Sequence, residues 1–407
     1  MNSYLRLDEC CQIELSSIDK KSKPNEKSVK LCNFTDVYYN WNIYSSMIDG
    51  FMEATASDKN ISSFLLKKGD VVVTKDSETR DDIGMAALVY EDLPNTVLGY
   101  HCALIRPKKN IDGAYLNAYL NSYLGRKHFR NQASGSGQRY TLTKESLGSI
   151  KIPVIPMTEQ KKIGAFFSDI DKKIQNNIQT TTNLESLAKT IYDYWFLQFE
   201  FPNEDGKPYK SSGGKMVWND ELKREIPEGW EVFMVKDFCD IFTGKKDVNQ
   251  ALDTGKYKFF SCAPGYKYSN DKLYTGKAIL ISGNGSYTGR TIFVNDSFDL
   301  YQRTYACVMK PNYDNMLEYI FYTMKTFFVK RVSGGTHGSA IPYIVYNDIA
   351  NEHFYYNKEV VDTFMKTIES IQEHIIELSK ESQELASLRD FLLPLLMNGQ
   401  VTFKEVG

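Results

Sequence analysis

Two stretches of the chain place basic side chains directly before a loop of glycine, serine and other small polar residues. The loops are SGSGQRY at 134–140 and SGGTHGS at 333–339. The basic residues are Arg126, Lys127 and Arg130 before the first loop and Lys330 and Arg331 before the second. Cations at a helix C-terminus also favour the helix dipole, so ordinary surface loops are the alternative. Phosphate anchors beside an adaptable polar loop are what duplex DNA recognition requires, and this is the chemistry we predict.

Side chains that could read base edges gather around the same loops. Arginine can fork onto guanine, and glutamine or asparagine can pair with adenine. The candidates are Lys75, Ser77, Arg80, Ser136, Gln138, Arg139 and Tyr140 in the first half of the chain, and Asn284, Ser286, Tyr287, Arg290, Gln302, Arg303, Tyr305, Thr336 and His337 in the second. Gly283-Asn284-Gly285 is also a strong hairpin-turn signal, so Asn284 could simply turn the chain. Lysines and the two basic clusters are better interpreted as phosphate anchors.

Motifs for catalysis, cofactors and metals are absent from the sequence. Every Gly-Lys pair lacks the glycine that a P-loop places five residues earlier, and no GxGxxG joins a strand to a helix. The seven cysteines form no CxxC pair, and the five histidines have no metal-ligand spacing. We therefore expect a non-catalytic chain that carries neither a cofactor nor a metal.

The strands that position these residues occur twice. In the first half, KKGDVVVTKD is a short apolar run bounded by turn residues, and IGMAALVY and CALIRP follow it. GKAILISGNG, TIFVND and YACVMKP repeat this order about 200 residues later, with Gly84 and Gly289 in matching places. A repeat of this length is a duplicated domain, because solenoid periods are about 20–50 residues. We call the two copies the first head and the second head.

A heptad-patterned rod follows each head. Apolar residues in steps of three and four residues form a coiled-coil seam. The seam residues are Ile163, Phe167, Ile170, Ile174, Leu184, Ile191 and Trp195 in the first rod and Phe364, Ile368, Ile371, Ile375, Leu378 and Leu385 in the second. Asn177, Thr181 and Ser382 are polar interruptions that can fix the register. Pro394 and Gly399 should end the second rod.

The rods are expected to pack on each other. Each spans roughly 40 residues, or about 60 Å, which is more than one head could cover; the alternative is that each rod packs on its own head. The fold class is therefore α+β: two similar globular α/β heads joined by two long helices in an antiparallel coiled coil with a pseudo-two-fold axis. The predicted boundaries are 1–155 for the first head, 156–200 for the first rod, 201–228 for a linker, 229–357 for the second head, and 358–407 for the second rod and tail.

Composition narrows the cellular setting. The chain has 407 residues and a net charge of −2, which argues against a wholly basic nucleic-acid coat but permits local basic patches. The start has no signal-like segment, no apolar stretch approaches a membrane span, and the cysteines suggest a reducing compartment. We expect a cytoplasmic protein that does not contact a membrane.

Three segments resemble the DNA specificity subunit of type I restriction–modification systems (the HsdS family). They are MTEQKKIGAFFSDIDKKIQ, the stretch at 192–231 with its IPEGW motif at 226–230, and the ending LRDFLLPLLMNGQVTF. GDVVVTKDSETRDDIG and GSGQRYTLTKESLGSIKIP look like the strand core and terminal loop of a target-recognition domain. The likeness covers essentially the whole chain. It departs from the family pattern in the first head, which lacks a Pro-x-Gly-Trp opening, and at the end of the second head.

The resemblance implies that the chain confers sequence specificity on partners. These are two modification (methyltransferase) subunits, expected to carry S-adenosylmethionine, and restriction/translocase subunits. Each head would read one half of a split, asymmetric target in double-stranded DNA, directing adenine methylation or restriction, and the coiled coil would fix the spacing. The exposed faces of the rods and the apolar end of the chain are the docking candidates; alternatively, that end packs against the first rod and its Trp195. The rival interpretations are a non-DNA coiled-coil scaffold with two heads and a self-contained DNA enzyme.

Overall fold

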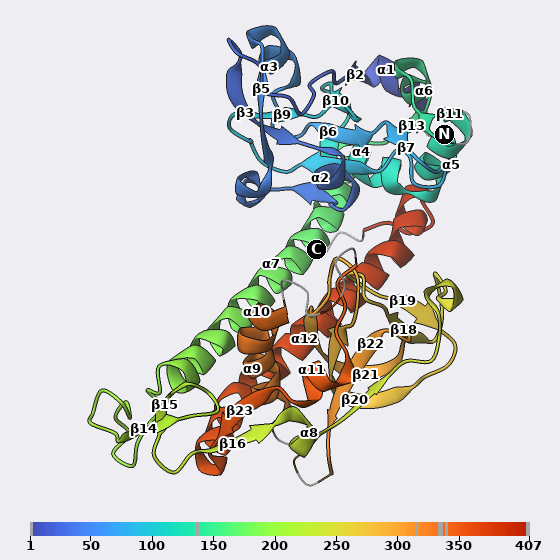
Figure 1. Ribbon diagram of the computed structural model, residues 1–407. Helices are drawn as coiled ribbons and strands as arrows, with labels where there is room; N and C mark the ends of the chain where they lie inside the picture. The colour runs from blue at the N-terminus through green and yellow to red at the C-terminus, as the bar shows by residue number, and fades with distance from the viewer. Residues whose placement is uncertain are drawn as a thin grey trace. The chain divides into compact units, whose positions relative to one another are not determined.

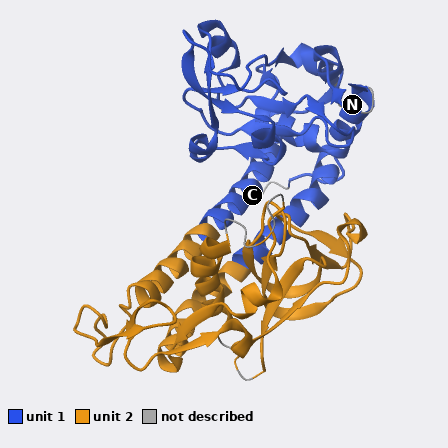
Figure 2. Cartoon of the chain, in the orientation of Figure 1, with its two compact units in different colours: residues 1–180, 377–407 blue, residues 181–376 orange. Residues whose placement is uncertain are grey.

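The computed structural model describes residues 3–135, 138–311, 313, 316–332, 337 and 341–403. The chain forms two compact units, one of residues 1–180 with 377–407 and one of residues 181–376 (Figure 2). Each unit contains one head and part of both long helices (Figures 1 and 2). No helix in the described part of the chain has the length and apolar character of a membrane span.

The first head is built on a five-stranded sheet. The strand order is β2 (Cys11–Leu15), β10 (Cys102–Pro107), β6 (Val71–Thr74), β8 (Ala86–Val89) and β4 (Asn42–Ile43). All neighbours are antiparallel except β8 and β4. Smaller sheets are β5 (Met52–Ala56) with β3 (Lys27–Cys32) and β9 (Thr96–Leu98), β1 (Ser3–Arg6) with β13 (Lys151–Val154), and β11 (Ser134–Gly135) with β12 (Tyr140–Thr141) and β7 (Asp76–Ser77). The helices are α1 (Leu7–Cys10), α2 (Phe34–Tyr38), η1 (Ser45–Gly50), α3 (Asp58–Phe64), α4 (Gly113–Asn121), α5 (Tyr123–Gln132) and α6 (Lys144–Gly148).

The second head repeats this plan with longer strands. Its sheet has the order β17 (Cys239–Thr243), β22 (Thr304–Met309), β20 (Tyr274–Ser282), β21 (Thr291–Leu300), β18 (Tyr257–Phe260) and β19 (Lys267–Ser269). The strands β16 (Glu231–Met234) and β23 (His353–Tyr356) pair, as do β14 (Met216–Asn219) and β15 (Arg224–Pro227) in the linker. The helices are α8 (Val235–Phe238), η3 (Val248–Gln250), α9 (Leu317–Thr323), the π-helical η4 (Met324–Phe328), α10 (Val329–Val332) and α11 (Tyr346–Ala350).

The duplication is visible in the strand pairing. In both heads, the strand of the main sheet that comes first in the chain pairs antiparallel with the one that comes last: β2 with β10, and β17 with β22. The other side of each sheet has a parallel pair, β8 with β4 in the first head and β21 with β18 in the second. The central strands are buried on both faces, as Val71, Val72 and Val73 show in the first head. A short strand covered on both sides needs an unbroken apolar run, which is the pattern of VVV and AILI.

Two long helices run through the molecule: α7 (Met157–Tyr192), which continues as the π-helical segment η2 (Asp193–Leu197), and α12 (Lys358–Met397). Within the first unit, Ile163 and Phe167 near the start of α7 share a core with Leu393 and Leu396 near the end of α12. Further along α7, Asn177 donates to Glu381 Oε2 at 2.7 Å and to Ser382 Oγ at 3.3 Å. Since residue numbers rise along α7 as those of its partner fall, the helices are antiparallel in this unit.

The second unit contains the other end of the helix pair. Tyr192, Trp195 and Phe196 surround Phe364 with ring centroids 5.1–6.1 Å apart. Among the seam candidates, Ile163, Phe167, Ile170, Trp195, Phe364 and Ile368 are buried, and Ile174, Leu184, Ile191, Ile371, Ile375, Leu378 and Leu385 are half-buried. Tyr192 and Phe196 are both fully buried, although the heptad pattern did not include them.

The end of α12 differs from the sequence prediction. Pro394 lies inside the helix, which continues to Met397 before Gly399 (φ +68°) ends it. A proline removes one hydrogen-bond donor, and here the loss falls in the last turn, where Leu393, Leu396 and Met397 are buried in the core of the first unit. Phe403 then packs on Phe166, with ring centroids 5.6 Å apart. The apolar end therefore contacts the start of α7, while Trp195 packs on Phe364.

Candidate nucleic-acid interface

Most of the predicted reading residues of the first head lie at one end of its sheet. After β6 the chain passes Lys75, whose backbone N–H donates to the His101 carbonyl at 2.9 Å and whose carbonyl accepts from Leu142 N–H at 2.8 Å. Asp76 and Ser77 then pair with Thr141 and Tyr140. Residues 75–77, 100–101 and 139–141 thus form one surface, which we call the first polar edge.

The second head builds the same edge with different residues. Gly283 N–H donates to the Arg303 carbonyl, and Ile344 N–H donates to the Gly283 carbonyl, both at 2.9 Å. Asn284 pairs with Tyr343, as Asp76 pairs with Thr141. Matching hydrogen bonds therefore make Lys75 equivalent to Gly283, Asp76 to Asn284 and His101 to Arg303. Residues 283–285, 302–303 and 342–343 form the second polar edge.

A glycine sets the course of the loop beside each edge. Gly84 (φ +78°) donates to the Thr74 carbonyl at 3.0 Å, and Gly289 (φ +81°) donates to the Ser282 carbonyl at 2.8 Å. A Cβ on Gly84 would lie 2.4 Å from a ring carbon of Phe129, and one on Gly289 would lie 2.3 Å from a methyl group of Val332. Both glycines supply a left-handed turn and room for the neighbouring helix.

A buried carboxylate organises the side chains of the first polar edge. Asp76 is 8% exposed, and it accepts hydrogen bonds from Lys75 Nζ at 3.1 Å and from Thr141 Oγ1 at 2.8 Å. His101 Nδ1 lies 2.9 Å from Asp76 Oδ2, and Arg139 Nη2 lies 3.3 Å from the same oxygen. Burial by itself would raise the pKa of Asp76, but the hydrogen bonds from His101, Thr141 and Lys75 outweigh it and hold that pKa below its usual value.

The His101 ring cannot serve both of its neighbours at once. Its Nδ1 also lies 2.8 Å from Arg139 Nη2. A guanidinium group donates only, and an imidazole nitrogen either donates or accepts, so Nδ1 bonds to Asp76 or to Arg139 in any one tautomer. The ion pair between Asp76 and Arg139 does not depend on this choice.

The other candidates of the first head surround this cluster. The exposed Arg80 guanidinium lies 5.0 Å from the ring centroid of Tyr140, which is half-buried. Ser77 accepts from Thr79 N–H at 3.2 Å, and Gln138 is exposed. Ser136 lies outside the described residues. His101, which we did not predict, is the residue that the structure adds to this edge.

The candidates of the second head are spread more widely. Arg303 is exposed, and its guanidinium makes no hydrogen bond or ion pair to any residue that the structure describes. Gln302 donates to Asp247 Oδ2 at 3.2 Å, and Asn284 is half-buried. His337 stacks on Tyr343 with ring centroids 5.2 Å apart. Its Nε2 lies 3.4 Å from Asp348 Oδ2.

Four candidates next to the second polar edge either contact other parts of the protein or remain exposed. Arg290 donates from Nη1 to the Ala263 carbonyl at 3.0 Å, so part of its guanidinium holds a neighbouring loop. Tyr305 is half-buried, and its hydroxyl lies 3.5 Å from the Ile344 carbonyl. Ser286 and Tyr287 are exposed. Thr336 lies outside the described residues.

The chain is similar to known proteins along most of its length. The family model described as the type I restriction modification DNA specificity domain matches residues 4–186 and 227–380, once in each half. The chain belongs to this family. It is 25% identical to the MjaIX specificity subunit of Methanocaldococcus jannaschii, over 86% of this chain and 81% of that one. Identity is also 25% to the HindI specificity subunit of Haemophilus influenzae, over 83% and 87%.

Among solved structures, the S subunit of a type I restriction–modification system from M. genitalium aligns with a TM-score of 0.55. The alignment covers 97% of this chain and 95% of that one at 14% sequence identity, so it concerns the fold alone. Two specificity domains in one chain account for the matching strand orders of the two heads.

The basic clusters of the two specificity domains are partly engaged within the protein. Arg126 donates to the carbonyls of Ile83 at 2.7 Å and Asp81 at 2.6 Å, and burial lowers its pKa. Arg331 donates to Glu352 Oε2 from Nε at 2.9 Å and from Nη2 at 2.6 Å. Both arginines brace the fold, which the sequence pattern does not reveal.

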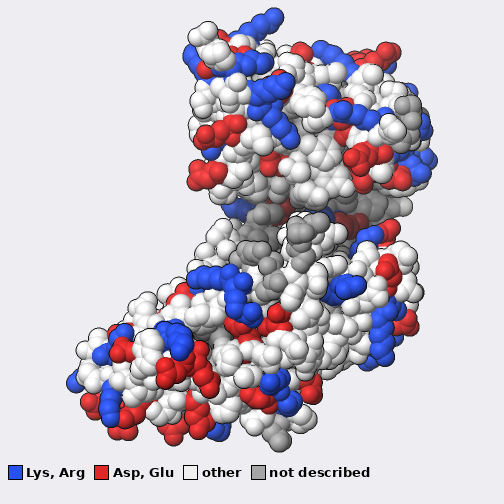
Figure 3. Space-filling model, in the orientation of Figure 1, with Lys and Arg blue, Asp and Glu red and all other residues white. Residues whose placement is uncertain are grey.

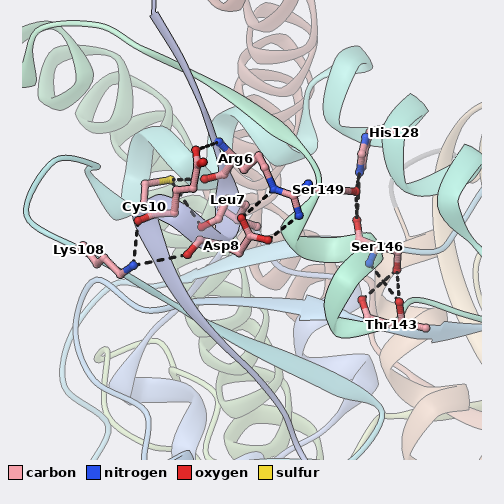
Figure 4. A network of polar contacts seen from close by, with 10 residues as sticks. Arg6, Leu7, Asp8, Cys10, Lys108, His128, Thr143, Ser146 and Ser149 are labelled. Carbon is pink, nitrogen blue, oxygen red and sulfur yellow. Dashed lines mark hydrogen bonds and ion pairs between the residues drawn. The ribbon is translucent and has the colours of Figure 1, made fainter.

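The contact that Arg331 makes with α11 has a counterpart in the first specificity domain. Arg331 Nη2 donates to the Asp348 carbonyl in α11 at 2.8 Å. In the first domain, His128 Nε2 lies 3.1 Å from the Ser146 carbonyl in α6 (Figure 4). Thr143 caps α6 by accepting from Ser146 N–H at 3.1 Å. In both domains a basic side chain thus ties the helix after the sheet to the short helix before the last strand.

The remaining basic residues of the clusters are exposed. Arg130 pairs with Asp81 at 3.0 Å, and Lys127 Nζ lies 5.6 Å from the ring centroid of Tyr123. Lys330 is exposed as well. On the face that Figure 3 shows, basic and acidic side chains are interspersed over both units. No group of histidine, cysteine and acidic side chains that could hold a metal ion occurs among the described residues.

Proposed function

We propose that this chain is the DNA-reading subunit of a type I restriction–modification complex, in which each specificity domain reads one half of a bipartite, asymmetric target. The observation that carries the proposal is the pair of equivalent polar edges, one in each copy of a DNA specificity domain. Each edge presents an exposed arginine, Arg139 or Arg303, among smaller polar groups. Arginine forked onto guanine is the commonest specific contact in the major groove.

The proposal assigns the spacing of the half-sites to the helix pair. A helix of 36 residues such as α7 is about 54 Å long, which is an upper bound on the separation. Domains that approach one side of a duplex favour half-site centres about one turn, or roughly 34–36 Å, apart. A pseudo-two-fold relation between the domains would present them to opposite strands. The antiparallel packing of α7 and α12 in the first unit supports this assignment.

Catalysis belongs to partners in this proposal. Two modification subunits would bring S-adenosylmethionine and methylate adenine, and restriction/translocase subunits would join the same complex in the cytoplasm. An adenine must leave the base stack for methylation, at a cost of a few kcal/mol. The exposed faces of the long helices are the proposed docking surfaces.

Replacing Arg303 tests the proposal. With the chain assembled with its modification subunits in a host, Arg303→Ala should relax modification at one position of the half-site read by the second specificity domain. Discrimination there should fall by about 1–3 kcal/mol, since one arginine–base contact is lost. Sequencing of methylated sites provides the measurement, with Lys127→Ala as the phosphate-contact control that weakens all sequences alike. Equal relaxation of both half-sites would contradict the assignment of one half to each domain.

A further inference from the structure

The two polar edges differ in their electrostatic design, although their backbones match. The first edge contains a buried carboxylate, Asp76, contacted by Lys75, His101 and Arg139. At the equivalent positions, the second edge has the neutral Asn284, and Gly283 in place of the lysine. Asp76 is therefore a feature of one domain and not of the shared fold.

Exposure within the first cluster rises from the carboxylate outward. Asp76 is 8% exposed and Lys75 is 13% exposed, whereas His101 is 26% exposed and Arg139 is 54% exposed. A carboxylate accepts but does not donate, and this one already has four polar neighbours. Asp76 is thus poorly placed to contact DNA, while Arg139 has the exposure that such a contact needs.

We propose that Asp76 is a positioning residue that holds Arg139 for contact with a guanine in the half-site read by the first specificity domain. A guanidinium carries five donors in a fixed plane, so a carboxylate can hold one part while another part forks onto guanine O6 and N7. Fixing the long side chain before binding reduces the rotamer entropy lost on contact. This inference rests on the proposed function, because it requires that the polar edges read DNA.

The second domain provides an internal comparison. Arg303 occupies the position equivalent to His101 and has no carboxylate partner among the described residues. Base contact by Arg303 therefore does not depend on a neighbouring carboxylate such as Asp76. Loss of the Asp76 charge should change one half-site and leave the other as it was.

A matched pair of substitutions separates positioning from stability. Asp70 is a second buried carboxylate, 3% exposed, just before the other end of β6. Arg106 contacts its two oxygens at 2.8 and 2.9 Å. Asp70→Asn and Asp76→Asn make the same chemical change near the two ends of β6, but only Asp76 lies at the first polar edge.

The experiment is selection of bound duplexes from a randomised DNA library by the full chain assembled with its modification subunits. For Asp76→Asn we expect the preference for guanine at one position of one half-site to fall roughly tenfold, with the other half-site unchanged. Asp70→Asn should lower the melting temperature and leave the selected motif intact. An Asp76→Asn complex that selects the wild-type motif at wild-type frequencies would overturn the inference while leaving the proposed function in place. A wild-type complex that selects no two-part motif would overturn the proposed function, and this inference with it.

Discussion

At the scale of single residues, Gly84 and Gly289 make the sharpest prediction about stability. Alanine at either position would adopt a left-handed backbone and bring its Cβ within 2.4 Å of the neighbouring helix. Strain and overpacking together should cost about 2–4 kcal/mol of folding free energy. Denaturant unfolding of the Gly84→Ala and Gly289→Ala variants measures the loss. Gly206→Ala is the control, because Gly206 has the same backbone sign (φ +74°) and nothing within 4 Å of a Cβ. A loss no larger than that of the control would show that Phe129 and Val332 can move aside at little cost, which would contradict the prediction.

Arg331 and Arg130 both belong to the basic clusters, but their removal should affect stability differently. Arg331→Ala would leave the Glu352 carboxylate, which is 9% exposed, without its cation, and we expect a loss of about 1–3 kcal/mol in stability. Burial raises the pKa of Glu352 despite Arg331, so the deficit should shrink as the pH falls and the carboxyl group becomes neutral. Arg130→Ala removes an exposed ion pair and should cost under about 1 kcal/mol. Melting curves at several pH values measure both; a deficit in Arg331→Ala that grows on acidification would contradict the assigned role.

Residue types were predictable from the sequence, but their partners were not. Arg80, Arg139 and Arg303 are exposed and remain candidates for DNA contact. Arg126 and Arg331 instead bind backbone carbonyls and a buried carboxylate. The likeness of CALIRP to YACVMKP aligns His101 with Tyr305. Strand pairing aligns it with Arg303 instead, and pairing registers are set by long-range hydrogen bonds.

At the scale of elements, the polar interruption of the helix seam makes a testable prediction. Asn177 is 3% exposed and is held by Glu381 and Ser382 across the helix pair. A polar seam residue fixes register at a cost in stability, so Asn177→Leu should leave stability unchanged or raise it by about 1 kcal/mol. Ser382 and Glu381 are half-buried and retain access to water. Thermal unfolding measures the change, with Thr180→Leu on the exposed face as the control. A drop of more than about 2 kcal/mol would mean that Asn177 is needed for stability itself.

Strands and long helices were predictable because short-range patterns encode them. VVVT and the heptads identify β6, α7 and α12, since burial on both faces or on one stripe requires these spacings. The prediction that Pro394 helps to end the second rod was wrong, because packing of the last turn against the start of α7 outweighs one missing hydrogen bond. The heptad pattern also did not include Tyr192, just before the π-helical segment, or Phe196 within it, because the periodicity shifts there.

At the scale of the whole molecule, one chain carries two specificity domains, and each unit contains a contact between α7 and α12. Under the proposed function, duplication would let a single polypeptide recognise an asymmetric sequence, because each polar edge can carry its own side chains on a common backbone. The contrast between Asp76 and Asn284 is one result of that freedom.

The proposed function requires that the two specificity domains read separate halves of one DNA target. The most direct measurement is a genome-wide map of methylated adenines in a host that carries this chain with its modification subunits. We expect an asymmetric motif with two specified blocks, separated by an unspecified gap and centred about one helical turn apart. A single continuous motif, or methylation without sequence preference, would contradict it.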